Sequence, residues 1–133
     1  MLVLDRVGKT YPNGVRALDG IDLKVGPGEV VAVVGGSGCG KSTLLRAICG
    51  LDTPRQGRVL LNGETITSPH ESIGIVFQEA RLLPWLSIAD NVGFGLENRP
   101  RAERKQRVVN ALNRVGLGDK ARVWPRELSG GQA

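Results

Sequence analysis

Two kinds of hydrophobic pattern divide the chain. Up to residue 86, apolar residues mostly occur in short runs or alternate with polar residues, which is typical of β-strands. Residues 21–25 alternate and predict a half-buried strand, whereas residues 30–34 are apolar throughout and predict a strand buried on both faces. Farther along, apolar residues recur at helical spacing. The pattern therefore predicts an α/β fold, with an antiparallel β piece and a core over 1–86 and a helical part over 87–133.

Further strands are expected in the first part. Residues 2–11 are partly apolar and end in a turn signal, so with 21–25 they predict an antiparallel piece that joins the core strand at 30–34. Short strands are also expected at 58–61, before the hairpin-type dipeptide Asn62-Gly63, and at 73–77.

Helices are predicted from their start and stop signals. One begins after Lys41 and ends at Gly50, which suits the position that follows a helix. A second starts with Ser87 as its N-cap. A third begins near Pro100 and ends at Gly116, with apolar residues at i, i+4 and i+7 between them.

The strand predicted at 30–34 runs directly into a glycine-rich loop with the pattern Gly-x-x-x-x-Gly-Lys-Ser, followed by a helix. Glycines allow backbone N–H groups to converge on a phosphate, and the helix directs its positive end to the same place. Lys41 is expected to bind the β- and γ-phosphates, Ser42 to bind Mg²⁺, and Thr43 to reach the α-phosphate. The alternative is a plain glycine-rich turn, which this strand–loop–helix context disfavours. The candidate nucleotide-binding residues of the loop are Gly35, Gly36, Ser37, Gly38, Cys39, Gly40, Lys41, Ser42 and Thr43.

Four other stretches carry candidate chemistry. Tyr11, beside a turn, either packs or stacks on a base, and its spacing alone favours packing. Gln78 follows the strand predicted at 73–77, where a metal or water ligand can lie, although an ordinary loop residue is the simpler interpretation. Residues 80–86 hold Leu, Pro and Trp and either fold under a loop or form an exposed patch for a partner. Ser129 and Gln132 have capping-box spacing and predict a helix start.

Composition limits the remaining classes of function. No apolar run approaches the length of a membrane-spanning helix, and the N-terminus lacks the features of a signal peptide. The two cysteines indicate no disulfide framework and favour a reducing cytoplasm. The net charge is +5, but the basic residues of 99–107 have no aromatic residues among them, so a solvated helix face is expected there and no nucleic-acid partner.

The phosphate loop, the glutamine at 78 and the sequence Leu-Ser-Gly-Gly-Gln at 128–132 occur in an order that closely resembles the ATP-binding subunits of ABC transporters. The resemblance covers the whole chain and implies a P-loop NTPase fold that binds ATP and Mg²⁺. It implies that Tyr11 stacks on adenine and that Gln78 contacts Mg²⁺ and couples to a membrane subunit. It also implies that the signature residues bind the ATP held by a second subunit; they are Ser129, Gly130, Gly131 and Gln132.

The resemblance further implies a set of partners. These are a second nucleotide-binding subunit, a permease docked near residues 78–85 and, indirectly, a periplasmic or extracellular solute-binding protein. The protein is then expected at the cytoplasmic face of the membrane as a peripheral subunit. Residues 77–85 look most like the nitrate, sulfonate and taurine importers.

One departure from the family's pattern bears on catalysis. No apolar run after the phosphate loop ends in Asp-Glu, so the glutamate that polarises the attacking water is absent, as are the aspartate near Mg²⁺ and the switch histidine. The chain is therefore expected to be the N-terminal half of a transport ATPase, with strands beside 30–34 supplied by the other half. Two alternatives stay open: a nucleotide-binding fragment without catalysis, and a soluble ABC ATPase that acts outside transport.

Overall fold

The computed structural model describes all residues from 1 to 133, which form two compact units, Met1–Val76 and Phe77–Ala133. The division falls before the boundary considered after residue 86, because residues 77–86 belong to the helical unit; the assignment of domains itself stays a prediction. None of the helices combines the length and apolar character needed to cross a bilayer.

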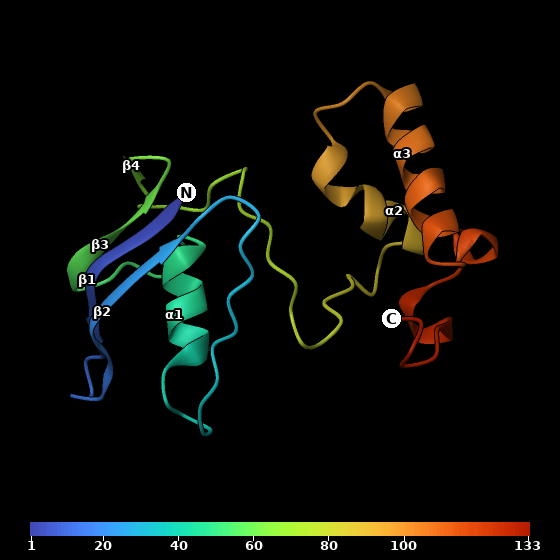
Figure 1. Cartoon of the computed structure of the whole chain (residues 1–133). Coiled ribbons are helices and arrows are strands. Elements are labelled where there is room, and N and C mark those ends of the chain that lie inside the picture. The colour runs from blue at the N-terminus through green and yellow to red at the C-terminus, as the bar shows by residue number, and fades with distance from the viewer. The chain divides into compact units, whose positions relative to one another are not determined.

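The first unit contains one antiparallel sheet, drawn in blue and green in Figure 1. Its strands are β1 (Leu2–Thr10), β2 (Arg16–Val25), β3 (Gln56–Leu61) and β4 (Glu64–Thr65), in the order β2-β1-β3-β4. The predicted antiparallel piece is confirmed, and exposure alternates along 21–25 as expected for a half-buried strand.

The hairpin between β3 and β4 is also confirmed. Asn62 and Gly63 have φ values of 52° and 90°, and a two-residue turn with both φ angles positive matches the twist of its flanking strands.

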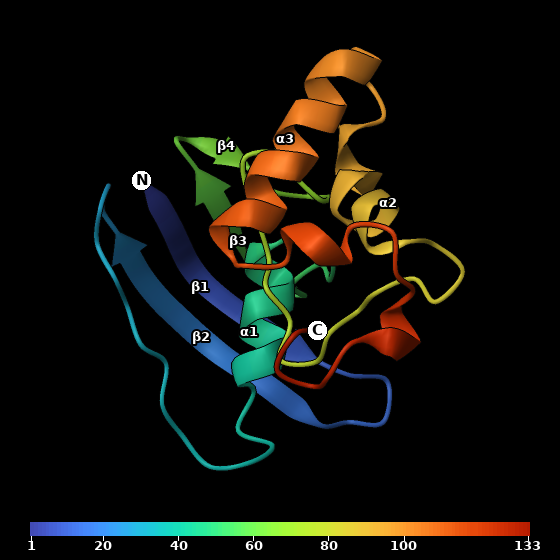
Figure 2. The ribbon, with the colours of Figure 1, turned by 90° about the vertical axis from the view of Figure 1, so that its right-hand side faces the viewer.

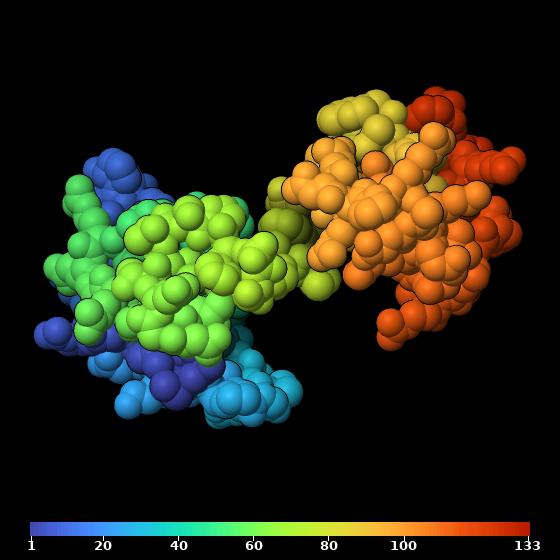
Figure 3. Space-filling view, turned by 90° about the horizontal axis from the view of Figure 1, so that it is seen from above, coloured from blue at the N-terminus to red at the C-terminus, as the bar shows by residue number.

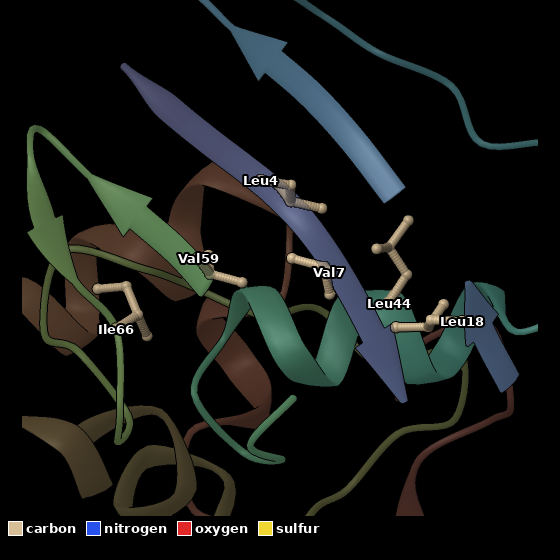
Figure 4. Packing of buried hydrophobic residues seen from close by; sticks show 6 residues of the cluster. All are labelled: Leu4, Val7, Leu18, Leu44, Val59 and Ile66. Atoms are coloured by element: carbon tan, nitrogen blue, oxygen red, sulfur yellow. The ribbon is translucent and has the colours of Figure 1, made fainter. Parts of the chain in front are cut away.

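Helix α1 (Lys41–Ile48) lies across one face of this sheet (Figure 2). The side chains between the two layers are aliphatic, and Figure 4 shows six of them, one from α1 and five from the strands or the residue after β4: Leu4, Val7, Leu18, Leu44, Val59 and Ile66. Their burial holds α1 on the sheet and so fixes the position of the loop that precedes it. The helix ends as predicted, with Gly50 at φ 69° just beyond it.

Two predicted strands are absent, and those predictions were wrong. Residues 30–34 and 73–77 have no assigned strand, and all pairings in the sheet are among β1 to β4. Val30 and Val34 are 93% and 91% exposed, and Val76 is 98% exposed. A strand needs hydrogen bonds to a neighbouring strand, and neither segment has one here.

The second unit is helical. It contains α2 (Ile88–Gly93) and α3 (Arg101–Arg114), with three short 3₁₀ turns, η1 (Phe94–Leu96), η2 (Gly118–Lys120) and η3 (Pro125–Glu127). In the space-filling view, orange α3 makes up much of the visible face of this unit (Figure 3). Its core consists of Ile88, Val108 and Leu112.

The boundary signals of these helices are confirmed. Ser87 caps α2 by accepting a hydrogen bond from the Asp90 backbone N–H, and Pro100 directly precedes α3. Gly116, with φ 72°, follows α3.

Candidate functional site

The N-terminus of α1 is open. It has no side-chain cap and no acidic residue in its first turn. The first helical hydrogen bond runs from the Leu44 N–H to the Gly40 carbonyl, at 2.8 Å. The N–H groups of Lys41, Ser42 and Thr43 precede that bond, so they have no acceptor within the helix. Several donors and the positive end of the helix dipole are therefore available to an anion.

Lys41 places its ammonium group inside the loop that leads to α1. Its Nζ donates to the carbonyl oxygens of Gly35 and Gly36, each at 2.7 Å, and lies 3.5 Å from the Sγ of Cys39. These contacts hold the positive charge over the loop. A phosphate that enters the loop can accept hydrogen bonds from the same ammonium group. Because the phosphate carries a negative charge, these hydrogen bonds are stronger than those to neutral carbonyls.

Glycine is favoured at different positions of the loop for different physical reasons. Gly40 has φ 98°, and a Cβ there would lie 2.2 Å from the backbone oxygen of Ala17 on β2, so only glycine fits. At Gly36 and Gly38, a Cβ would meet nothing within 4 Å. The backbone at these two positions faces open space, where a ligand can approach its N–H groups closely.

Tyr11 is joined to the phosphate loop's helix. Its hydroxyl lies 3.1 Å from the Oγ1 of Thr43, a buried residue of the first turn of α1. The ring is partly exposed just beyond β1. The residue expected to stack on the base and the residue expected to reach the α-phosphate are therefore in direct contact.

Two residues that sequence reasoning missed lie beside Tyr11. The Nζ of Lys9 forms an ion pair with Asp52 and lies over the Tyr11 ring, 5.7 Å from its centroid. Lys9 and Tyr11 are two residues apart near the end of a strand, so a shared face was a readable signal. Asp52 gave no such signal, because it reaches Lys9 only through the packing of α1 on the sheet.

The remaining predicted site residues lie in the helical unit. The structure thus brings together Tyr11 and the loop of 35–43, whereas the roles of Gln78 and the signature residues toward nucleotide stay predictions. Gln78 is exposed, and next to it the guanidinium of Arg81 lies 4.4 Å from the centre of the Phe77 ring.

Asn91 of α2, also missed from the sequence, fixes the segment that follows Gln78. Its Oδ1 accepts from the Leu83 N–H at 2.7 Å, and its amide nitrogen approaches three carbonyl oxygens at 3.0–3.1 Å, those of Leu83, Leu86 and Ser87. The loop so held leaves Trp85 67% exposed. An exposed tryptophan on a fixed loop is suited to contact with a partner.

The signature sequence forms a single turn that agrees with the predicted helix start, because the Ala133 N–H donates to the Ser129 carbonyl at 3.1 Å, as in the first turn of an α-helix. The Ser129 N–H donates to the Gln132 side chain at 3.1 Å, which is one half of the predicted capping box. The Gln132 N–H donates back to the Ser129 carbonyl at 2.9 Å. A Cβ at Gly130 or Gly131 would meet nothing within 4 Å, so this backbone is open to a ligand or partner.

The sequence and structure of the chain are similar to those of known transport ATPases. It is 52% identical over 131 residues to the aliphatic sulfonates import ATP-binding protein SsuB of Pseudomonas fluorescens, covering 98% of this chain and 47% of that protein. It is 46% identical to the taurine import ATP-binding protein TauB of Chromobacterium violaceum, covering 98% of this chain and 51% of that protein. The chain therefore spans about half the length of the curated relatives it matches.

Solved structures give the same result for the fold. The dimeric structure of MJ0796, a bacterial ABC transporter cassette, matches 99% of this chain and 65% of the cassette, with a TM-score of 0.86 and 34% identity. A second structure of MJ0796, a dimer in a post-hydrolysis state bound to ADP and Pi, matches with a TM-score of 0.85. The ABC transporter family model matches residues 18–133. The chain belongs to the ABC transporter family, with the fold of its ATP-binding cassettes.

Proposed function

We propose that this chain is the nucleotide-binding part of the ATP-binding subunit of an ABC importer. The observation that carries the proposal is the open N-terminus of α1, with the Lys41 ammonium held over the loop in front of it and Tyr11 bonded to its first turn. The names of the relatives, which are import ATP-binding proteins, support transport over the alternative of an ABC ATPase that acts outside it.

Each loop residue has a role in holding the triphosphate. Lys41 exchanges its two carbonyl partners for the β- and γ-phosphates, and the glycine backbone N–H groups surround the same oxygens. The Thr43 hydroxyl can accept from Tyr11 and donate to the α-phosphate at once, because a hydroxyl is both donor and acceptor.

The donor set also fits a magnesium ion. Ser42 offers a hydroxyl oxygen, which is a suitable ligand for a hard cation that is otherwise bound by phosphates and water. Gln78 is the second proposed ligand. When bound, Mg²⁺ neutralises charge on the phosphates.

A second copy of the subunit completes the site. The open turn of 129–132 contacts the phosphates held by the partner's loop, with Ser129, Gly130, Gly131 and Gln132 as the contacting residues. The dimers described for MJ0796 support this arrangement.

The segment 78–85 is the proposed docking site for a permease at the cytoplasmic face of the membrane. The exposed Trp85 and the loop fixed by Asn91 support it. The sulfonate and taurine importers among the relatives suggest a small sulfonate as the solute, delivered by a solute-binding protein.

Hydrolysis belongs to the whole protein. The residues described here bind and position a nucleotide, but no glutamate among them follows an apolar strand in the way that a general base for the attacking water requires. Robust phosphate release from the isolated 133-residue polypeptide would contradict this division of roles.

The test of the proposed function is Lys41→Ala in the full-length subunit. Loss of the ammonium should weaken ATP binding by more than about tenfold and abolish transport. Lys24→Ala is the matched control, because Lys24 is an exposed lysine on β2, outside the loop. If Lys41→Ala and Lys24→Ala bind and transport equally, the site is assigned wrongly.

A further inference from the structure

The ion pair between Lys9 and Asp52 is the most buried in the molecule. The two side chains are 17% and 25% exposed, whereas both members of every other pair are at least 31% exposed. Removing two charges from water costs free energy, so such a pair contributes less to stability than to holding one defined geometry.

The pair joins three segments. Lys9 lies near the end of β1, and its Nζ binds the Asp52 carboxylate and donates to the Thr53 carbonyl at 2.8 Å. Both acceptors follow the C-terminal end of α1. Two of the three ammonium N–H groups are thus directed at fixed acceptors, and the charge lies over the Tyr11 ring.

Tyr11 is consequently held at two points. Its hydroxyl is bonded to Thr43, and one face of its ring is covered by the Lys9 ammonium. A nucleotide base can stack only on the other face. The ring is therefore fixed in orientation before any ligand arrives, which lowers the entropy lost on binding.

We infer that Lys9 and Asp52 are positioning residues for the nucleotide base. This inference rests on the proposed nucleotide site. The pair touches neither the base nor the phosphates; it acts through Tyr11, whose stacking face it sets. The affinity that the base adds to the triphosphate then depends on the pair, whereas the affinity of the triphosphate itself does not.

The experiment compares two ligands, ATP and inorganic tripolyphosphate, which has no base. Both dissociation constants are measured by calorimetry with Mg²⁺ on the full natural chain, and their ratio gives the contribution of adenosine. In Lys9→Met, which keeps the side chain's length, ATP should bind about fivefold more weakly while tripolyphosphate is unchanged, because only preorganisation of the ring is lost. Lys9→Arg should restore the ratio, and Lys24→Met, on the exposed face of β2, should leave it unaltered.

The other outcomes overturn the inference in distinguishable ways. If Lys9→Met weakens both ligands equally, Lys9 acts as a general positive charge and not through the ring. An unchanged ratio leaves the pair without a role in base binding. Should Lys9→Met fail to fold, Asp52→Asn releases the ammonium while preserving shape, and the same fall in the ratio is expected. If the unaltered protein binds neither ligand, the proposed function itself is wrong.

Discussion

The N-termini of α1 and α2 have opposite designs. At α2, the Ser87 hydroxyl accepts from the Asp90 N–H at 3.2 Å and donates to the Asp90 carboxylate at 2.6 Å, so the helix is capped and its dipole is balanced by its own residues. At α1, neither a cap nor an acidic residue is present. The difference separates a helix end that serves the fold from one that is available to a ligand.

The open end has a stability cost. The N-cap of α1 is Gly40, and a glycine there lowers stability by only roughly 0.3 kcal/mol relative to serine or aspartate, a deficit that α1 carries unless an anion binds. A ligand that binds only the folded state then stabilises it in proportion to its concentration.

Closing the open end should have the largest effect. Ser42→Asp places a carboxylate in the first turn of α1, where it stabilises the helix but repels a triphosphate, so ATP affinity should fall about 100-fold. Ser42→Asn, which has the same shape and no charge, is the control and should lose much less. Equal affinities of the two variants, measured by calorimetry, would contradict an anion site at this helix end.

A substitution of Asn91 tests how the loop before α2 is held. Asn91→Leu removes the side-chain partner of the Leu83 N–H and the Leu86 carbonyl, whereas the other two carbonyls keep a backbone donor. Leaving two groups unpaired should lower the free energy of unfolding by about 2 kcal/mol. Tryptophan fluorescence reports this unit alone, because Trp85 and Trp124 both belong to it. Asn110→Leu, at an exposed position of α3, should change little. Coincident denaturation curves for the two variants would show that Asn91 does not hold the loop.

The two cysteines compare the open loop with the packed core. Cys39 is exposed in the phosphate loop, whereas Cys49 is buried and burial raises the pKa of its thiol. Since the thiolate is the reactive form, a thiol reagent should label Cys39 first. Mg-ATP at ten times its dissociation constant should slow that labelling about tenfold, as its occupancy requires. Mass spectrometry that finds the same Cys39 labelling with and without nucleotide would count against the role of the loop.

The smallest effect is expected at the α2 cap. Ser87→Ala should lower the free energy of unfolding of the helical unit by about 1 kcal/mol and leave ATP affinity unchanged. Ser42→Ala should do the reverse, weakening Mg-ATP binding with no loss of stability. If both substitutions cost equal stability, the contrast between the two helix ends is not real.

Local chemistry accounts for the predictions that were confirmed. Gly50, Asn62 and Gly116 take up left-handed backbone conformations where the sequence indicated a helix end or a tight turn. Ser87 caps α2 as its position in the sequence indicated. Each of these signals acts within a few residues, so it can be recognised without the tertiary structure. The phosphate-binding role of the loop stays a prediction, which rests on residue types and spacing that match what a triphosphate requires.

The strands predicted at 30–34 and 73–77 show where local reasoning stops. An apolar, β-branched run identifies a segment that is suited to a sheet, but it does not supply the neighbour to which its N–H and C=O groups bond. The strands of the sheet pair with partners that are far away in the sequence; Leu4, for example, lies opposite Val59.

The sequence by itself determined the turns and the helix ends and predicted the anion-binding loop, because each depends on residues next to one another along the chain. Only the tertiary structure decided that Lys9 meets Asp52, that Tyr11 meets Thr43 and that Asn91 holds the loop before α2. The first two contacts exist because burial of aliphatic side chains presses α1 against the sheet. That packing fixes distances between residues whose separation in sequence carries no information about them.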